Sequence, residues 1–364
     1  MNDSKKNVSG STDYVTRHLE LLARAATDKI CQKHPEWESR FGAAGRTKCH
    51  EDARFHLLHL REALRTESPI LFEKYISWVR ILLDGLKIGT DDLVHFLLAI
   101  EHALPTEHED PEHVNQVRNM LQIGLLYLSK ADPESLKSNL PASGPYVDLS
   151  RDYLDAILAL RRRDALKIIL DTANAGTSIR DIYLEVFQPV QREIGRLWQT
   201  NQISVASEHY CTATTQWVMS QLYPMIMTDK LPDRRVIAVC VGGELHDIGI
   251  RMVADLFELA GWESMYLGAN VPVSGVISAI HGFQPHLLAV SVTLLIHLAT
   301  MDGLIKAVRQ EYTLQQLPIM VGGIPFLQDK NMWKKMNANC FAQDAEAAVS
   351  EAHKLLGSTC GDHL

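Results

Sequence analysis

The stretch RRVIAVCVGGELHDIGIRMVADLFELAG, residues 234–261, runs from a continuous apolar segment through a short loop into an amphipathic helix. An all-apolar strand followed by a helix is typical of a parallel sheet covered on both faces. His246 lies in the loop between them, where doubly wound α/β domains bind ligands. A neutral imidazole is a good transition-metal ligand, and Glu244 or Asp247 could fix its tautomer. A lone histidine in such a loop is more often structural, so the rest of the chain has to decide.

The remainder of the segment 234–358 repeats this alternation of strand and helix. Apolar runs bounded by turn residues are separated by helical patterns, which predicts a flavodoxin-like (Rossmann-like) parallel sheet. The expected strands are 264–269, 287–292 and 317–323 after the first, and the expected helices are 248–261, 272–283, 299–312 and 344–357.

The part of the chain before residue 234 has helical patterns and no strand signals. Residues 13–130 predict an all-helical domain, of globin-like or other all-α type, and residues 148–230 predict a four-helix bundle. Pro, Ser, Gly and Asp in residues 131–147 indicate a linker. The polar start, MNDSKKNVSGSTDY at residues 1–14, has no apolar signal core and predicts a disordered tail.

Composition excludes several classes of protein. The 364 residues are 46% hydrophobic and 22% charged, and the net charge of −8 implies no general surface for polyanions. No apolar run reaches the roughly 20 residues of a membrane span. The cysteines have no metal-binding spacing, which favours a reduced, cytoplasmic protein. They are Cys31, Cys49, Cys211, Cys240, Cys340 and Cys360.

Two further signals follow the strands expected next to the first one. Ser291 and Thr293 end one strand, and the pair Gly322–Gly323 ends another. Carboxyl ends of parallel strands meet at one edge of a sheet, so these residues are expected to share a crevice with His246. Two hydroxyls and a flat glycine pair suit a long polar ligand that enters the sheet domain.

The pattern E-x-H-x-x-G at 244–249, with S-V-T at 291–293 and Gly322–Gly323, resembles the cobalamin-binding domain. The resemblance covers residues 234 to about 358 and implies that His246 replaces dimethylbenzimidazole as the lower cobalt ligand. Glu244 departs from the more usual aspartate, a departure that light-sensing relatives share. The alternative, a Rossmann-like domain for another nucleotide, lacks the G-x-G-x-x-G loop. The implied cofactor-binding residues are Glu244, Asp247, Gly249, Leu267, Gly268, Ser291, Thr293, Gly322 and Gly323.

A second pattern lies in the expected bundle, where Trp198 precedes Glu208 and His209 by a W-x9-E-H spacing. Taken alone, such a tryptophan is usually core and such an exposed pair has no function. The spacing resembles the signature of adenosylcobalamin photoreceptors, including light-dependent repressors of carotenoid synthesis. That resemblance implies that Trp198 lies beside the upper adenosyl group and that the Glu-His pair contacts it. The repressors have a cobalt-binding histidine after the tryptophan, and here that position is Gln199.

The first domain differs from that of the repressors, which is basic and binds DNA. Here it is helical with many acidic residues, so direct nucleic-acid binding is not expected. An all-helical domain ahead of the bundle resembles the photocobilins, which pair adenosylcobalamin with biliverdin. Basic side chains suit the two bilin propionates, although most such histidines are surface residues. The candidates for bilin binding are His50, Arg54, His56 and His59.

These patterns together predict a light sensor rather than an enzyme. Photolysis of the cobalt–carbon bond is expected to drive a conformational or quaternary change. No effector domain is expected after the cobalamin module, so output is predicted to pass through light-dependent homo-oligomer assembly or an unknown protein effector, without a membrane. Two alternatives remain open, a corrinoid carrier for methyl transfer and a cobalamin-dependent transcriptional anti-repressor.

Overall fold

The structure is a computed structural model that describes residues 2–36, 42, 44–105, 111–130, 137–227, 232 and 234–357. The chain divides into two compact units, Met1–Glu134 and Ser135–Leu364, and each is described by itself. Among the described residues, no helix combines the length and the apolarity that crossing a membrane requires. The five cysteines in this part of the chain are free thiols.

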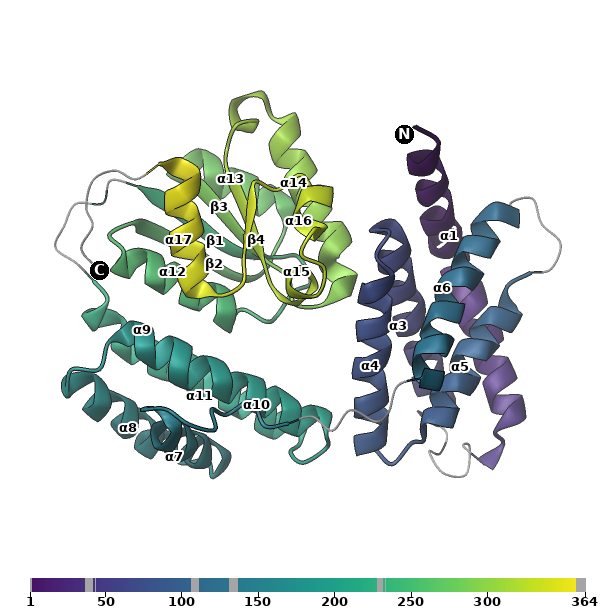
Figure 1. The fold of residues 1–364 in the computed structure, drawn as a ribbon, viewed down its shortest axis with the longest axis horizontal. Coiled ribbons are helices and arrows are strands. Elements are labelled where there is room, and N and C mark those ends of the chain that lie inside the picture. Colours follow the sequence, from purple (N-terminus) through teal and green to yellow (C-terminus); the bar gives the residue numbers. More distant parts are fainter. Residues whose placement is uncertain are drawn as a thin grey trace. The chain divides into compact units, whose positions relative to one another are not determined.

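The first unit is all-helical over its described residues, as predicted (Figure 1). Its core is built from aliphatic and aromatic side chains on every helix, for example Leu22, Leu57, Phe72, Leu97 and Leu121, each at most 1% exposed. Residues that favour helix N-termini stand where two of the helices begin. Pro69 is the first residue of one helix, and at the start of another Asp92 accepts a hydrogen bond from Gly89 N (3.3 Å). The helices are α1 (Asn2–Lys33), α3 (Ala44–Arg65), α4 (Pro69–Gly85), α5 (Thr90–Ala103) and α6 (Pro111–Lys130).

The prediction of a disordered tail is wrong for this structure, because α1 begins at Asn2. Ser11, Tyr14 and Val15 are 1%, 4% and 0% exposed, so the helix is already packed on the core near its start. The linker prediction holds only in part. Residues 131–136 lie outside the described residues, but Asn139 N donates to Glu193 Oε2 (2.7 Å). This contact ties the later part of the predicted linker to the second unit.

The second unit begins with a helical module, which we define as residues 147–225. Its helical stretches lie where the sequence predicts them, and serine side chains cap two of them, Ser178 and Ser204. A π-helical turn precedes Pro189, whose missing N–H interrupts the ordinary helical ladder. The elements are α7 (Val147–Leu158), α8 (Arg162–Asn174), α9 (Ile179–Asp181), η1 (Ile182–Phe187), α10 (Gln188–Gln199), α11 (Val205–Leu222) and η2 (Tyr223–Met225).

The last part of the second unit, residues 234–357, is an α/β segment that we call the sheet module. It contains five parallel strands in the order β2-β1-β3-β4-β5. This is the predicted flavodoxin-like topology. Val236, Ala238 and Cys240 share a buried cluster with residues of α12 (Ile248–Leu259) and α17 (Ala345–Leu356), so the intervening residues of the first strand face the opposite side of the sheet. The strands are β1 (Arg235–Val241), β2 (Glu263–Val271), β3 (Leu287–Ser291), β4 (Ile319–Gly322) and β5 (Cys340–Ala342). The helices are α12 (Ile248–Leu259), α13 (Val273–Phe283), η3 (Leu295–His297), α14 (Leu298–Gln310), η4 (Tyr312–Leu314), α15 (Ile324–Gln328), α16 (Met332–Lys335) and α17 (Ala345–Leu356).

The two modules of this unit pack together through α12. Met252 and Leu256 belong to the same buried cluster as the helical module. Tyr183 of that module donates a hydrogen bond to Asp255 (2.7 Å), and both side chains are buried. Arg251 reaches α11, where it donates to Gln216 O (3.0 Å) and Ser220 Oγ (2.9 Å). The helical module is therefore fixed over the end of the sheet at which α12 begins.

Candidate functional site

A buried carboxylate organises the loop after β1. Glu244 is fully buried, and its oxygens accept hydrogen bonds from the backbone N–H groups of His246 (3.0 Å), Thr293 (2.7 Å) and Leu294 (2.9 Å). Burial opposes ionisation, but hydrogen bonds from the His246 side chain and from backbone N–H groups outweigh it and lower the pKa of Glu244 to about 2. The side chain is thus an anion that ties the β1 loop to the β3 loop.

His246 is held by this anion. Its Nδ1 lies 2.5 Å from Glu244 Oε1, while 56% of the imidazole side chain is exposed. The sequence left Glu244 and Asp247 as alternatives for this contact, and the structure selects Glu244. Asp247 instead accepts hydrogen bonds from Gln216 (2.7 Å) and Tyr266 (2.7 Å). Hydrogen bonding to Glu244 raises the pKa of His246 above its usual value, against the effect of burial.

The predicted convergence of the strand ends is confirmed. Strand register places Cys240, Ser291 and Gly322 side by side across β1, β3 and β4. Val292 N donates to Gly322 O (3.1 Å), and Gly323 has φ +106°. A Cβ at Gly323 would lie 1.8 Å from Val292 O, so only glycine fits where the two loops meet. Thr293 joins this group through its bond to Glu244.

The other predicted residues of the sheet module surround the same loop. At Gly249 an added Cβ would meet no atom of the described residues within 4 Å, so packing among them does not require glycine there. Leu267 is half-buried and Gly268 is buried, with φ +76° beside the Tyr266 ring. Next to His246, Leu245 leaves 69% of its surface exposed.

Sequence reasoning missed several residues of this site. Asn270 Oδ1 accepts from Gly243 N (2.8 Å), and Asn270 N donates to Glu244 O (2.9 Å). Gln216, Tyr266 and Leu294 contact the two acidic residues of the loop from other elements. Their partners lie at least 19 positions away in sequence, and no short pattern marks them.

The helical module places α11 over the His246 loop. Glu208 is close enough to contribute to the raised pKa of His246, and its Oε1 accepts from Thr212 Oγ1 (2.8 Å). His209 Nδ1 contacts Glu208 Oε2 (2.7 Å) and is 74% exposed. Trp198, at the end of α10, is half-buried, whereas Gln199 is only 8% exposed. The Glu-His pair and the tryptophan therefore belong to the same module as predicted, with Glu208 on the side of His246.

A cavity of about 500 Å³ lies elsewhere between the two modules. Its lining includes Ser220 and Tyr223 from the helical module, Arg251 and Asp255 from α12, and Tyr266 from β2. His246 is not among the lining residues, but Tyr266, which donates a hydrogen bond to Asp247, borders both this cavity and the His246 loop.

The four candidates for bilin binding on α3 divide into two sets. His50 and Arg54 are partly exposed and face Glu20, with His50 Nε2 at 3.7 Å and Arg54 Nε at 2.8 Å. His56 and His59 are buried and both contact Tyr75. A hydrogen bond of 2.6 Å joins His56 Nδ1 to the tyrosine hydroxyl, and the His59 ring stacks on the tyrosine ring at 3.8 Å. The structure thus brings these candidates together in pairs rather than as one site.

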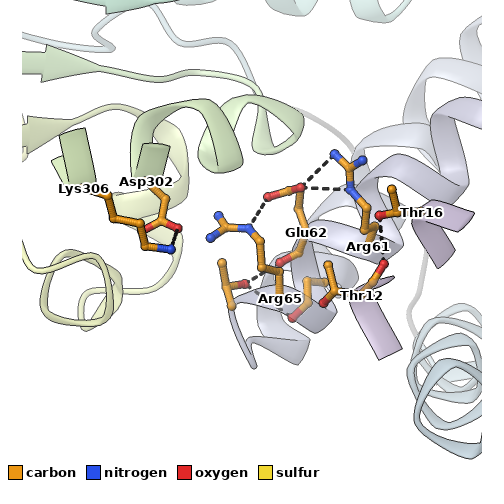
Figure 2. Close-up of polar contacts among 9 residues, drawn as sticks. Thr12, Thr16, Arg61, Glu62, Arg65, Asp302 and Lys306 are labelled. Carbon is orange, nitrogen blue, oxygen red and sulfur yellow. Dashed lines mark hydrogen bonds and ion pairs between the residues drawn. The ribbon is translucent and has the colours of Figure 1, made fainter. Parts of the chain in front are cut away.

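Two further arginines of α3 are engaged with a buried carboxylate (Figure 2). Arg61 and Arg65 donate hydrogen bonds to Glu62, which is fully buried, at 3.0 Å and 2.8 Å. Arg54 already pairs with Glu20. A propionate that binds to α3 would therefore have to compete with a carboxylate of the chain for any of these guanidinium groups.

The buried His56 predicts a pH-dependent stability. Burial lowers the pKa of His56 to about 4, against about 6.5 in the unfolded chain. Below pH 6.5 the unfolded state binds a proton that the folded state does not, so stability falls as the pH is lowered toward 4. The loss between pH 7 and pH 5 should be about 2 kcal/mol. Urea unfolding of the wild type and of His56→Gln measures it, and an equal pH dependence in both proteins would contradict the assignment.

Two family models match the second unit. Residues 234–352 match the B12 binding domain, and residues 149–223 match a second model with the same description. These two segments are therefore B12-binding domains. The segment 234–352 contains His246 and the residues at the neighbouring strand ends. The segment 149–223 contains Trp198, Glu208 and His209. The cobalamin-binding interpretation of the E-x-H-x-x-G pattern is confirmed at this level.

Similar curated proteins are corrinoid proteins. The dimethylamine corrinoid protein of Methanosarcina barkeri is 30% identical over 117 residues, which are 32% of this chain and 54% of that protein. Trimethylamine corrinoid protein 1 of Methanosarcina acetivorans is 21% identical over 206 residues, 56% of this chain and 94% of that protein. This chain thus spans about half the length of the dimethylamine corrinoid protein of Methanosarcina barkeri and of dimethylamine corrinoid protein 1 of Methanosarcina mazei.

A solved structure has a similar fold. The monomethylamine corrinoid protein of Methanosarcina barkeri aligns with 58% of this chain and 100% of its own, with a TM-score of 0.52 and 20% sequence identity. At this identity the likeness shows the fold alone.

Proposed function

We propose that this protein binds cobalamin in its base-off form, with Nε2 of His246 as the lower cobalt ligand. One observation carries the proposal, the contact between the buried Glu244 carboxylate and Nδ1 of the exposed imidazole. A carboxylate on one ring nitrogen orients the other nitrogen and raises its basicity, which is how proteins present histidine to a metal. The contact lies within a segment that matches the B12 binding domain.

The residues around His246 fit a large and partly apolar group. Leu245 is an exposed leucine beside the imidazole, and Gly249 opens onto free space. Ser291, Thr293 and the Gly322–Gly323 pair would hold the displaced nucleotide tail with their hydroxyl and backbone groups. Asp247 is oriented by Gln216 and Tyr266, so it would present a fixed acceptor at the rim.

The helical module would cover the upper face of the cofactor. Glu208 on α11 lies near His246, and Trp198 belongs to the neighbouring helix end. Trp198 would hold the adenosyl group by aromatic packing, and Glu208 and His209 would hold it by hydrogen bonds. These assignments rest on the W-x9-E-H resemblance together with the position of Glu208.

We further propose that the protein is an adenosylcobalamin-dependent light sensor. The bound cofactor supplies a weak cobalt–carbon bond that visible light breaks. The chain supplies a group of contacts that loss of the upper ligand can bias, namely Gln216 to Asp247, Arg251 to Ser220 and Tyr183 to Asp255. A shift in these contacts would change the surface available for homo-oligomer assembly or for a protein effector. Biliverdin, bound by the first unit, is proposed as a second chromophore on the basis of architecture.

A corrinoid carrier for methyl transfer is the second candidate. It is favoured by the trimethylamine corrinoid protein, most of whose length matches this chain, and by the fold of the monomethylamine corrinoid protein. A carrier needs an upper face that a partner methyltransferase can reach. The two candidates therefore differ in their preferred upper ligand, since the light sensor should favour adenosyl- over methylcobalamin.

Reconstitution in the dark separates the two candidates. We expect the full chain to bind adenosylcobalamin more tightly than methylcobalamin and to change its elution volume in size-exclusion chromatography after green light. Trp198→Ala should weaken adenosylcobalamin binding by about 10-fold, because a large aromatic contact is lost. Tyr223→Ala, which removes an aromatic residue from the lining of the cavity of about 500 Å³, is the control. Equal binding of both cofactors, with no effect of light on elution, would favour the carrier.

A further inference from the structure

Three side chains with metal-binding groups meet in the first unit, outside the B12-binding domains. They are His34, which follows the end of α1, and Asp92 and His95 on α5. One ligand atom of each lies within 4.8 Å of the others. His34 Nε2 and His95 Nδ1 are 3.0 Å apart.

Local structure fixes these three groups. Asp92 and His95 are three residues apart on one helix, so they share a face. Asp92 is held at the start of α5 by the hydrogen bond from Gly89 N (3.3 Å). His34 N donates to Ile30 O (2.8 Å), which continues the last turn of α1 and directs the side chain toward α5.

A carboxylate contacts one ring nitrogen of His34, as is usual for histidines that bind a metal through the other nitrogen. Its Nδ1 lies 2.9 Å from Glu36 Oε1, and the side chain is 14% exposed. A carboxylate on Nδ1 leaves Nε2 to face the cluster. The pairing repeats, in the other unit, the contact between Glu244 and His246.

We propose that His34 Nε2, His95 Nδ1 and a carboxylate oxygen of Asp92 bind a divalent transition metal, Zn²⁺ by preference. Two imidazoles and one carboxylate are a common set of protein ligands for Zn²⁺, which leaves a fourth position for water or an anion. Two nitrogens at zinc distance in a tetrahedral site are roughly 3.3 Å apart. The observed separation of 3.0 Å needs only a small adjustment to admit the ion.

One of the three cluster residues, His95, also lines a cavity that has two lysines in its wall. This cavity of about 220 Å³ is lined also by Lys29, Lys33 and His102. The carboxylates of Glu36 and Asp92 offset the lysine charges at the metal itself. The two ammonium groups favour a small anion, rather than a neutral molecule, as the fourth ligand.

Zinc titration of the full chain tests this proposal. The protein is prepared without a histidine tag, without cobalamin and with His246→Ala, so that the corrinoid histidine cannot take up the ion. We expect about one equivalent of Zn²⁺ after dialysis, measured by mass spectrometry of the metal and by competition with a chromogenic chelator. His34→Ala and His95→Ala should each weaken binding at least about 10-fold. His18→Ala on α1, which the cluster does not include, should leave affinity unchanged.

Folding of each variant is checked by circular dichroism. Asp92→Asn supplies a milder variant, because its amide oxygen can still accept from Gly89 N while the ligand charge is lost. It should retain the helical spectrum and bind Zn²⁺ more weakly. Folded protein that takes up no Zn²⁺, or takes it up equally well in the two histidine variants, would overturn the proposal. The contact between His34 and His95 would then be an ordinary hydrogen bond.

Discussion

Replacing His246 by alanine is expected to abolish the base-off, His-on absorbance spectrum of the reconstituted protein. The imidazole is the only described side chain of the β1 loop that presents a nitrogen ligand to the crevice, and it is 56% exposed. Its loss should therefore remove the lower ligand without removing core packing. We expect corrinoid affinity to fall at least about 10-fold, or about 1.4 kcal/mol. Thermal stability should also fall, because the buried Glu244 anion loses its hydrogen bond from the imidazole.

Two other variants distinguish the loss of cobalt ligation from a loss of folding. Glu244→Gln keeps the shape of the carboxylate but removes its charge, so it should weaken cobalt ligation about 10- to 100-fold and also destabilise the loop. His209→Ala, on the helical module, should retain the His-on spectrum because it removes no lower ligand. An unchanged spectrum in His246→Ala would refute the assignment of the cobalt ligand.

Gly323→Ala is expected to cost about 2–4 kcal/mol in the free energy of unfolding. Residue 323 has φ +106° and ψ 178°, a conformation that belongs almost solely to glycine. The added Cβ would also lie 1.8 Å from Val292 O, in the loop that carries Thr293. Since that carbonyl is backbone, it cannot move aside cheaply. The variant should therefore unfold at a lower denaturant concentration and bind corrinoid poorly.

Neighbouring glycines provide matched controls for this prediction. A Cβ at Gly322 would meet Ala342 O at 3.4 Å, so Gly322→Ala should cost less than about 1 kcal/mol. Gly249→Ala should leave stability unchanged, because nothing lies within 4 Å, and should weaken corrinoid binding if the cofactor fills that space. Equal unfolding curves for Gly323→Ala and Gly322→Ala would contradict the account of the crevice.

The fold of the second unit could be predicted because its central strands β1, β3 and β4 are buried on both faces. Continuous apolar runs such as Val236–Val241 have no other good explanation in a chain of this composition. The last strand, Cys340–Ala342, was not predicted, because three residues are too few for a recognisable pattern. The helical state of the polar start was also not predicted, since the burial of residues such as Ser11 depends on neighbouring helices.

The site could be predicted as far as the residues that follow each strand. His246, Ser291 and Gly323 lie at carboxyl ends of neighbouring strands, and parallel topology alone brings them together. The choice of Glu244 over Asp247 as the partner of His246 could not be made from sequence, because both are close to it. It depends on backbone N–H groups of the β3 loop, which make Glu244 a buried anion.

The first unit was less predictable. The histidines of α3 suggested a single ligand site, but helical geometry sends His50 to the surface and His56 to the core. The cluster of His34, Asp92 and His95 was missed, because its members come from helices separated by more than 50 residues. Only the packing of α1 on α5 brings them together.

Electron paramagnetic resonance of the bound cofactor in its Co(II) state tests the central claim most directly. Protein labelled with ¹⁵N-histidine is reconstituted with unlabelled cobalamin and reduced. Ligation by His246 predicts that each cobalt line is split into a doublet by the ¹⁵N nucleus, and that His246→Ala loses this splitting. A triplet in the labelled protein would show that the cofactor's own ¹⁴N base remains bound, which would contradict the proposed role of His246.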